Sequence, residues 1–173
     1  MAETEEILKI IKERFPTAVL EESLQGVEPF FVFAPAVIDE LGLFLRDDPR
    51  LKFDLLSVIS TVDWLPQAAS ADGKTPAKAG LIEVVYILDS TTHRHRLVAK
   101  AKLDRDNPRI KTVETIWRAA DWHEREAFDL MGIIFEGHHN LVRILCAEDW
   151  EGHPLRKDYV IPDTYHGIKN VVY

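Results

Sequence analysis

The side chains best suited to chemistry are concentrated between positions 121 and 159. This stretch, DWHEREAFDLMGIIFEGHHNLVRILCAEDWEGHPLRKDY, contains four of the seven histidines and the only cysteine of the 173-residue chain. It also contains two tryptophans and many acidic and basic residues. Such a density is typical of an active site, or of a surface that becomes buried against another protein. The spacing of the residues separates the two possibilities.

The spacing of the histidines does not support a metal site. His123 and Glu124 begin the zinc-binding pattern HExxH, but the second histidine would stand where the chain has Ala127. His138 and His139 are adjacent, and adjacent side chains in regular structure point in different directions. We therefore predict no metal ligand in this chain.

The other catalytic motifs are also incomplete. The GKT at 73–75 lacks the glycine that a phosphate-binding loop needs five residues before Gly73, because Ala68 stands there. His93 and His95 share a strand face, but they stand among arginines, which disfavour a bound cation. The sequence contains no GxGxxG and no GxSxG. Cys146 lies in the apolar run VRILCA and is interpreted as a small buried hydrophobe. We predict no catalytic and no cofactor-binding residue.

The composition excludes several classes of protein. The net charge of −8 opposes nonspecific binding to nucleic acid or to an anionic membrane surface. No window of about 18 apolar residues is present that could span a bilayer, and the opening MAETEEILK is not a signal peptide. A single cysteine can form neither an intramolecular disulfide nor an iron–sulfur site. We expect a chain in a reducing cytosol that reaches a membrane only through a partner.

Hydrophobic periodicity predicts an α+β fold. The expected elements are a helix at 4–15, strands at 17–24 and 29–33 with a turn around Gly26, a helix at 35–46, and strands at 53–65, 80–90 and 93–103. Thr112 is expected to cap a short helix over TVETIW. Asp121 and Glu124 resemble a capping box for a helix over DWHEREAFDLM, which Gly132 ends. The order α-β-β-α-β-β-β-α predicts a mixed or antiparallel sheet with helices packed on it.

The remaining residues predict an extended tail. We assign 1–133 to the α+β domain and 134–173 to a tail, since no sustained periodicity follows residue 132. A long segment without elements of its own is typical of a chain that leans on a partner. Trp150 and Tyr159 alternate there with Arg156 and Asp158, and aromatic and arginine anchors are typical of protein–protein interfaces. Composition therefore favours an interface over catalysis.

Two separated motifs carry a family resemblance. They are WHEREAFDLMGIIFEGH, followed by RIL, and EDWEGHPLRKDY. Together they resemble the signature of the C subunit of complex I, the type I NADH:quinone oxidoreductase, known in mitochondria as the thirty-kilodalton subunit. The chain departs from the family pattern at Val142, where a basic residue or proline is frequent, and at Arg118, where proline is frequent. The matched residues, to which we assign subunit-interface and structural roles, are Glu124, Arg125, Glu126, Phe128, Asp129, Gly132, His138, Arg143, Asp149, Trp150, Gly152, His153, Pro154, Arg156, Lys157, Asp158 and Tyr159.

The resemblance implies a non-catalytic subunit of the hydrophilic arm, on the cytoplasmic side of the cell membrane. It implies that the D subunit is the main partner, that the B and I subunits lie nearby, and that FMN, iron–sulfur clusters and quinone reside in partner subunits. On this basis Glu124, Arg125, Glu126 and Asp129 are expected to form ion pairs that lock the helix to the tail and to the D subunit. His138, Arg143, Arg156 and Asp158 are expected to join that network.

Other functions stay open. Membrane-bound hydrogenases, F420H2 dehydrogenases and ferredoxin-driven complexes use similar subunits with a different electron-input module. A free-standing metalloenzyme that uses the histidines, and a nucleic-acid-binding module, are alternatives from other classes. The negative charge opposes the second of these.

Overall fold

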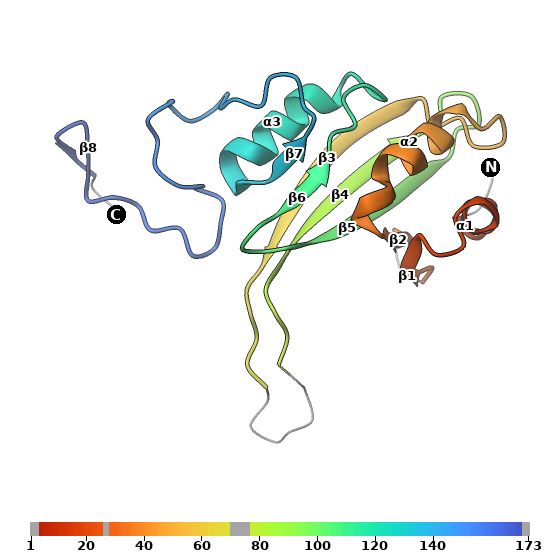
Figure 1. Ribbon diagram of the computed structural model, residues 1–173, viewed down its shortest axis with the longest axis horizontal. Coiled ribbons are helices and arrows are strands. Elements are labelled where there is room, and N and C mark those ends of the chain that lie inside the picture. Colours follow the sequence, from red (N-terminus) through yellow and green to blue (C-terminus); the bar gives the residue numbers. More distant parts are fainter. Residues whose placement is uncertain (1–3, 26–27, 70–76, 171–173) are drawn as a thin grey trace.

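The computed structural model describes residues 4–25, 28–69 and 77–170 (Figure 1). Helices α1 (Thr4–Arg14), α2 (Ile38–Asp47) and α3 (Ala120–Met131) accompany a short 3-10 helix, η1 (Pro35–Val37). The strands are β1 (Val19–Ser23), β2 (Phe30–Phe33), β3 (Leu55–Trp64), β4 (Leu81–Asp89), β5 (Arg96–Asp104), β6 (Arg109–Lys111), β7 (Ile134–Glu136), β8 (Thr164–Tyr165) and β9 (Ile168–Lys169). The expected turn around Gly26 and the GKT at 73–75 lie outside the described residues.

The sheet is mixed, as the sequence predicts. Its five strands follow the order β1-β2-β5-β4-β3. β2 runs parallel to β5, whereas the other neighbours pair antiparallel. The hairpin predicted for 80–103 is formed by β4 and β5, with Leu81 opposite Asp104 and Asp89 opposite Arg96. The α+β class and the order of the first seven elements are confirmed.

The helices pack along one face of this sheet (Figure 1). Alternate residues of β4 point to that face, because successive side chains of a strand point to opposite sides. Ile82, Val84 and Tyr86 are almost fully buried and share one hydrophobic core with apolar residues of the three helices. Ile11 and Leu41, from α1 and α2, are fully buried in the same core.

The predicted helix over TVETIW is wrong. Residues 112–119 form hydrogen-bonded turns, in which the amides of Ile116 and Trp117 both donate to the carbonyl of Val113 at 2.9 Å. Burial explains the difference, because Trp117 enters the core and its Nε1 donates to the carbonyl of Phe53 at 2.8 Å. A Cβ on Gly42 would lie 2.8 Å from the Ile116 Cδ1, so α2 and this turn approach each other closely.

The capping box predicted for α3 is also wrong. The helix begins at Ala120, and no side chain caps it at Ala119. Glu124 turns away from the helix start and binds residues 112–113 instead. The helix ends as predicted, because Gly132 adopts the left-handed conformation (φ 73°) that glycine tolerates.

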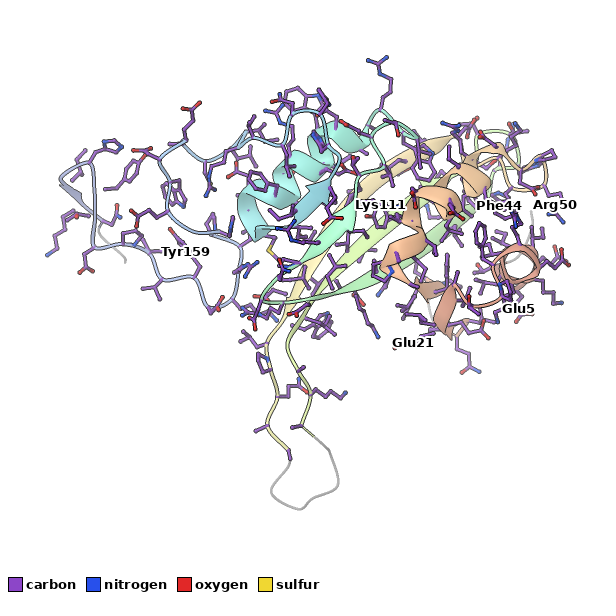
Figure 2. All side chains as sticks on the ribbon, viewed as in Figure 1. Glu5, Glu21, Phe44, Arg50, Lys111 and Tyr159 are labelled. Atoms are coloured by element: carbon purple, nitrogen blue, oxygen red, sulfur yellow. The ribbon has the colours of Figure 1, made fainter. Side chains whose placement is uncertain are left out.

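The helices and the strands up to β7, which pairs in parallel with β6, are together called the sandwich, and the chain leaves it after β7. Of the predicted tail, residues 134–136 form β7, so from here on we use the name tail for residues 137–170, which form only the short β8–β9 hairpin. Tyr159 on the tail and Glu5 on α1 lie at opposite ends of the molecule (Figure 2). Among the helices of the described residues, α3 is the one that lies beside the tail and forms hydrogen bonds with it (Figure 1).

Candidate functional site

Helix α3 carries two buried carboxylates, Glu124 and Asp129, both 0% exposed. An isolated buried charge costs several kcal/mol, so each carboxylate must find donors or remain protonated. Asp129 finds its donors in the tail, whereas Glu124 finds its donors in residues 112–113.

Asp129 fastens the tail to the helix. Its carboxylate accepts hydrogen bonds from the backbone amides of Ile144 (3.0 Å), Leu145 (2.7 Å) and Cys146 (2.9 Å). It also forms an ion pair with Arg143, whose Nη1 lies 2.7 Å from Oδ1. Burial raises the pKa of Asp129, but these donors outweigh it and hold that pKa well below its usual value. The predicted ion pair between Asp129 and the tail is present.

Three backbone carbonyls in the last turn of α3 accept hydrogen bonds from the tail. Such carbonyls have no partner within a helix. The donors are the His153 Nδ1 to Asp129 O at 3.0 Å, the Leu155 amide to Leu130 O at 3.0 Å, and the Arg156 Nε to Met131 O at 2.8 Å. Thus Arg156 joins the network through carbonyls rather than through an ion pair.

Gly132 makes this contact possible. A Cβ at this position would lie 2.5 Å from the ring of His153, closer than any real contact. Its φ of 73° is a conformation that side chains rarely tolerate. The DLMG end of α3 and the GHPLR segment of the tail are therefore complementary in shape.

Asp63, a buried carboxylate outside α3, fastens the tail to the sheet. Asp63 on β3 is 3% exposed and pairs with Arg105, whose Nε lies 2.7 Å away. Arg105 also pairs with Asp158 at 2.7 Å, and the Lys157 amide donates to the Asp63 Oδ2 at 2.9 Å. Hydrogen bonds to both carboxylates, Asp63 first, raise the pKa of Arg105 above its usual value. Sequence reasoning missed Asp63 and Arg105, which lie outside both motifs.

Glu124 is satisfied from within the sandwich. Its carboxyl group accepts a hydrogen bond from the Thr112 hydroxyl at 2.5 Å and one from the Val113 amide at 2.8 Å. Burial raises the pKa of Glu124 to about 7, and the two hydrogen bonds only partly oppose that effect. The buried His138 ring lies nearby, with its Nε2 4.0 Å from the Glu124 Oε2.

The exposed side of α3 carries residues without strong partners. The Arg125 guanidinium lies 5.2 Å from the Trp122 ring centre, and its Nε donates to the Val142 carbonyl at 3.2 Å. Among the described residues, neither Arg125 nor Glu126 forms an ion pair. The expectation that both hold the tail by ion pairs is therefore wrong within this chain. Trp122 is 63% exposed.

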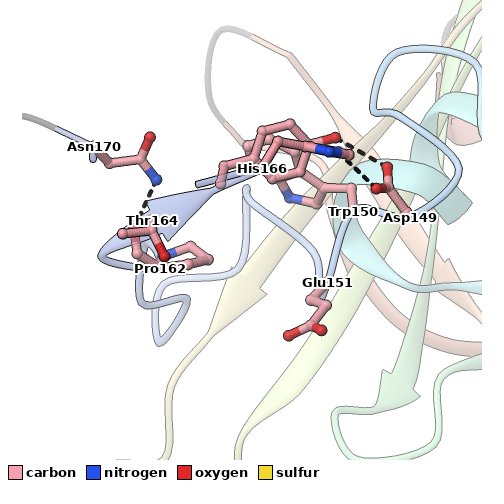
Figure 3. A pocket seen from close by; sticks show the side chains of 8 residues that line it. Asp149, Trp150, Glu151, Pro162, Thr164, His166 and Asn170 are labelled. Carbon is pink, nitrogen blue, oxygen red and sulfur yellow. Dashed lines mark hydrogen bonds and ion pairs between the residues drawn. The ribbon is translucent and has the colours of Figure 1, made fainter. Parts of the chain in front are cut away.

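The second motif also builds a hollow within the tail. The hollow has a volume of about 300 Å³ (Figure 3). Asp149 accepts a hydrogen bond from the Tyr165 hydroxyl at 2.9 Å and pairs with His166 at 2.8 Å. Asp149, Tyr165 and His166 line the hollow, and the other lining residues are Trp150, Glu151, Pro162, Thr164 and Asn170. The hollow is open and lies on the tail, so these contacts shape the tail itself.

The remaining second-motif residues turn the tail around this hollow. Gly152 has a φ of 79°, and a Cβ there would lie 3.0 Å from the Tyr159 ring. Pro154 and the nearby Tyr159 are half-buried. Phe128, from the first motif, is half-buried on α3.

Large apolar side chains remain exposed along the tail. They are Val142, Leu145, Leu155, Val160, Ile161 and Ile168, with exposed fractions from 48% to 82%. Where exposed apolar residues form a contiguous patch, the patch is typical of a surface that binds another macromolecule. Within the part of the chain that the structure describes, no helix is long and apolar enough to cross a bilayer.

One cluster could offer ligands to a cation. Glu114, Asp121, His138 and His139 each offer an atom, and these atoms lie within 4.8 Å of one another. Sequence reasoning dismissed the two histidines because adjacent residues diverge in regular structure. They lie instead in an irregular segment, where their ring centres are 5.3 Å apart and the rings are stacked, so both reach Glu114.

Cys146 is half-buried, and burial raises the pKa of its thiol, which disfavours a nucleophilic thiolate.

Sequence comparison places this geometry in a family. Residues 31–165 match the model of the family described as "Respiratory-chain NADH dehydrogenase, 30 Kd subunit". A protein of Chloroherpeton thalassium, named as the C subunit of NADH-quinone oxidoreductase, is 42% identical over 163 residues, which cover 93% of this chain and 62% of that protein. The protein of the same name from Chlorobium phaeobacteroides is 41% identical over 162 residues, covering 92% and 90% of the two chains. The chain thus spans less than two thirds of the length of the first relative.

Solved structures share the fold. A structure titled "Nqo5 of the trypsin-resistant fragment (1-134) in P63 form" is 23% identical, with a TM-score of 0.60 over 81% of this chain and 100% of that one. A chain of the membrane-bound sulfane sulfur reductase, described as an archaeal respiratory membrane complex, is 27% identical. Its TM-score is 0.70, over 92% of this chain and 87% of that one.

Proposed function

Because the chain belongs to the family of the 30 kDa subunit of respiratory-chain NADH dehydrogenase, we propose that it is a structural subunit of NADH:quinone oxidoreductase, complex I. In this role it performs no chemical step. It supports the assembly of a hydrophilic arm that carries electrons from NADH to quinone. The relatives named as the C subunit of this enzyme support the role.

The tail carries the proposal. It is fastened to the sandwich by polar contacts with Asp129, Asp63 and the end of α3. Those contacts leave Val160 82% exposed and Leu155 60% exposed. A segment that is positioned by hydrogen bonds and presents apolar side chains outward is suited to binding a partner. Without a partner these apolar side chains stay in water, so they add little to the stability of the chain.

We assign the partners by the family. The D subunit is the main partner of the tail and of the exposed side of α3, with the B and I subunits nearby. FMN, the iron–sulfur clusters and quinone belong to partner subunits, and this chain holds none of them. The single cysteine agrees, because one thiolate cannot hold a cluster. The chain lies at the cytoplasmic side of the cell membrane and contacts the membrane only through the complex.

A second candidate is the equivalent subunit of a related membrane complex. The likeness to a chain of the archaeal sulfane sulfur reductase favours it. Hydrogenases, F420H2 dehydrogenases and ferredoxin-driven complexes belong to the same group of candidates. Complex I is preferred because the relatives at 41–42% identity are named for NADH-quinone oxidoreductase.

A pull-down from gently solubilised native membranes tests the proposal. The tagged chain should co-purify with the D, B and I subunits and with a flavin-bearing NADH module, as identified by mass spectrometry. The same core with another input module would establish the second candidate. Recovery of the chain alone would contradict both.

A pair of surface variants tests the role of the tail. Val160→Glu combined with Ile161→Glu should abolish co-purification, because two charges would enter the apolar contact. The matched control is Leu20→Glu, which is 58% exposed on β1, a strand that lies away from the tail (Figure 1). Leu20→Glu should keep its partners. If the Val160→Glu, Ile161→Glu chain co-purifies with the partners as well as the control does, the tail is not the docking surface.

A further inference from the structure

Three acids converge on one buried imidazole beside the start of α3. The side chain of His138 is 0% exposed. Its Nε2 lies 3.5 Å from the Glu114 Oε2, 3.4 Å from the Asp121 Oδ1 and 4.0 Å from the Glu124 Oε2. Glu114 belongs to the turn after β6, whereas Asp121 and Glu124 belong to α3. His138 follows β7, so the cluster joins three separate segments.

The hydrogen bonds fix the position of the proton on His138. The Asn140 amide donates to the Nδ1 at 3.0 Å, so this nitrogen is unprotonated. The Nε2 therefore carries the proton, and it lies 3.3 Å from the Asp121 carbonyl. A metal would need the free electron pair of this same Nε2. The arrangement thus favours a hydrogen-bond donor surrounded by acceptors over a metal site.

The acids lack a buried positive partner. Within the described residues, no lysine or arginine forms an ion pair with Glu114, Asp121 or Glu124. Besides His138, the one basic side chain that binds these acids within the described residues is His139, which binds Glu114. Its ring, 65% exposed, lies 2.6 Å from the Glu114 Oε2, and its amide donates to the Oε1 at 2.7 Å.

Two further groups face the cluster from its two sides. On the solvent side, Arg118 lines the open hollow beside Glu114 and Asp121. On the core side is the buried phenol of Tyr86, whose pKa is raised by burial and by the charge of Glu124. Neither group neutralises Glu124, because one is exposed and the other is uncharged near neutral pH.

We propose that this cluster is a proton-dependent clasp between α3 and residues 137–142. The clasp holds this segment while Glu124 is neutral and loosens when Glu124 ionises. The inference is independent of the proposed function, because it concerns contacts within the chain.

Electrostatics gives the reason for loosening. Burial alone would raise the pKa of Glu114, but its hydrogen bonds with His139 lower it, so Glu114 is ionised near neutral pH. Ionised Glu124 would place a second buried carboxylate around the one N–H that His138 offers. Burial, assisted by Glu114 and Asp121, raises the pKa of Glu124 to about 7, so the transition ends close to neutral pH.

Only the first part of the tail should respond. Residues 144–146 are held by Asp129, whose pKa lies well below its usual value, so that contact does not change near neutral pH. A proton-dependent change confined to residues 137–142 therefore distinguishes the clasp from a general release of the tail.

Amide exchange of the full chain tests the clasp. Protection of the His139 and Asn140 amides, corrected for the intrinsic exchange rate, should fall roughly 100-fold between pH 5 and pH 7 and then level off. Protection of the Leu145 and Cys146 amides should stay constant. In Glu124→Gln, a mimic of the neutral acid, all four should be insensitive to pH. Glu126→Gln, an exposed position on the same helix, should behave like the natural chain.

Three results would overturn the clasp. One is a Glu124→Gln chain that keeps the fall in protection, and another is a parallel fall at Leu145 and Cys146. The third is stoichiometric Zn²⁺ binding that His138→Gln abolishes, because it would make the Nε2 a ligand. If Glu124→Gln fails to fold, carbon NMR of the natural chain decides. The Glu124 carboxyl carbon should titrate near pH 7, and titration at its ordinary value of 4.5 would contradict the clasp.

Discussion

The sandwich and the tail are held by different forces. The described residues of the sandwich surround one apolar core to which all three helices contribute. The tail contributes only Leu141, at the margin of that core, and is positioned by polar contacts with buried acids and helix carbonyls. Apolar burial needs the right volume, whereas the tail needs particular donors at particular places. We therefore expect the sandwich to keep its fold when the polar contacts of the tail are removed.

The largest expected effect is on the sandwich. Phe33→Ala should lower the free energy of unfolding by about 4 kcal/mol, because Phe33 is fully buried and its removal leaves a cavity. The tail should lose its protection in the same transition, since it depends on the sandwich. Chemical denaturation followed by near-ultraviolet absorbance and by amide exchange measures both. A tail that outlasts the sandwich would break the comparison.

Asp129→Ala should release the tail while the sandwich stays folded. The substitution leaves Arg143 and three backbone amides without their acceptor, and breaking a buried pair costs about 3 to 4 kcal/mol. Amides 144–156 should exchange rapidly, whereas those of β4 and β5 should remain protected. Glu126→Ala, on the exposed side of α3, serves as the control. Loss of both regions together would contradict separate anchoring.

The two buried acids of α3 predict opposite dependences on pH. The pKa of Glu124 is about 7 in the folded chain against an ordinary 4.5, so its ionisation opposes folding. The free energy of unfolding should therefore fall by about 3 kcal/mol as the pH rises from 4.5 to 7. Glu124→Gln should remove this fall.

Asp129 works in the other direction. Its folded pKa is lowered, so the stability that it contributes is complete above the unfolded value of 3.8 and is lost as the pH falls below it. Urea denaturation at a series of pH values measures both effects. A Glu124→Gln chain with the natural profile would show that this acid is not buried in its neutral form.

Gly132→Ala should have an intermediate effect. The φ of 73° and the contact with His153 should together cost about 2 kcal/mol. The cost should fall mainly on the tail, because the added methyl group meets a tail side chain. Gly137→Ala is a useful comparison. Its φ is also positive, but its Cβ would meet only the Thr112 Cγ2, at 3.6 Å. Equal losses of tail protection would mean that backbone strain alone decides.

The sequence predicted the sandwich better than the junction. Periodicity located seven strands and helices because each buries one face, which is a local property. It failed at residues 112–117 because burial of Trp117 overrides a short helix. β6 and β7 were missed, since a three-residue strand has too few residues for an alternating pattern.

The motif located the junction but not the roles within it. Glu124 and Asp129 look equivalent in the sequence, yet one binds its own sandwich and the other binds the tail. Asp63 and Arg105 complete the attachment from strand β3 and from the loop after β5, far from either motif. Such roles depend on which segments meet in space, which one sequence without relatives does not reveal. The proposed interface with the D subunit remains a prediction.

The smallest effect on the isolated chain should belong to Arg125. Arg125→Ala removes one hydrogen bond to the Val142 carbonyl and the contact with Trp122, so it should cost less than about 1 kcal/mol of stability. Arg125 is only half-buried and lies beside the tail, which suits it to a partner. The variant should therefore separate folding from assembly.

The central claim, that this chain assembles a complex rather than catalysing its reaction, is tested most directly by Arg125→Ala in native membranes. The amount of assembled complex and its NADH:quinone turnover per complex should be measured together. We predict fewer complexes, each with the natural turnover. Normal assembly with lost turnover per complex would contradict the account and place Arg125 in the reaction.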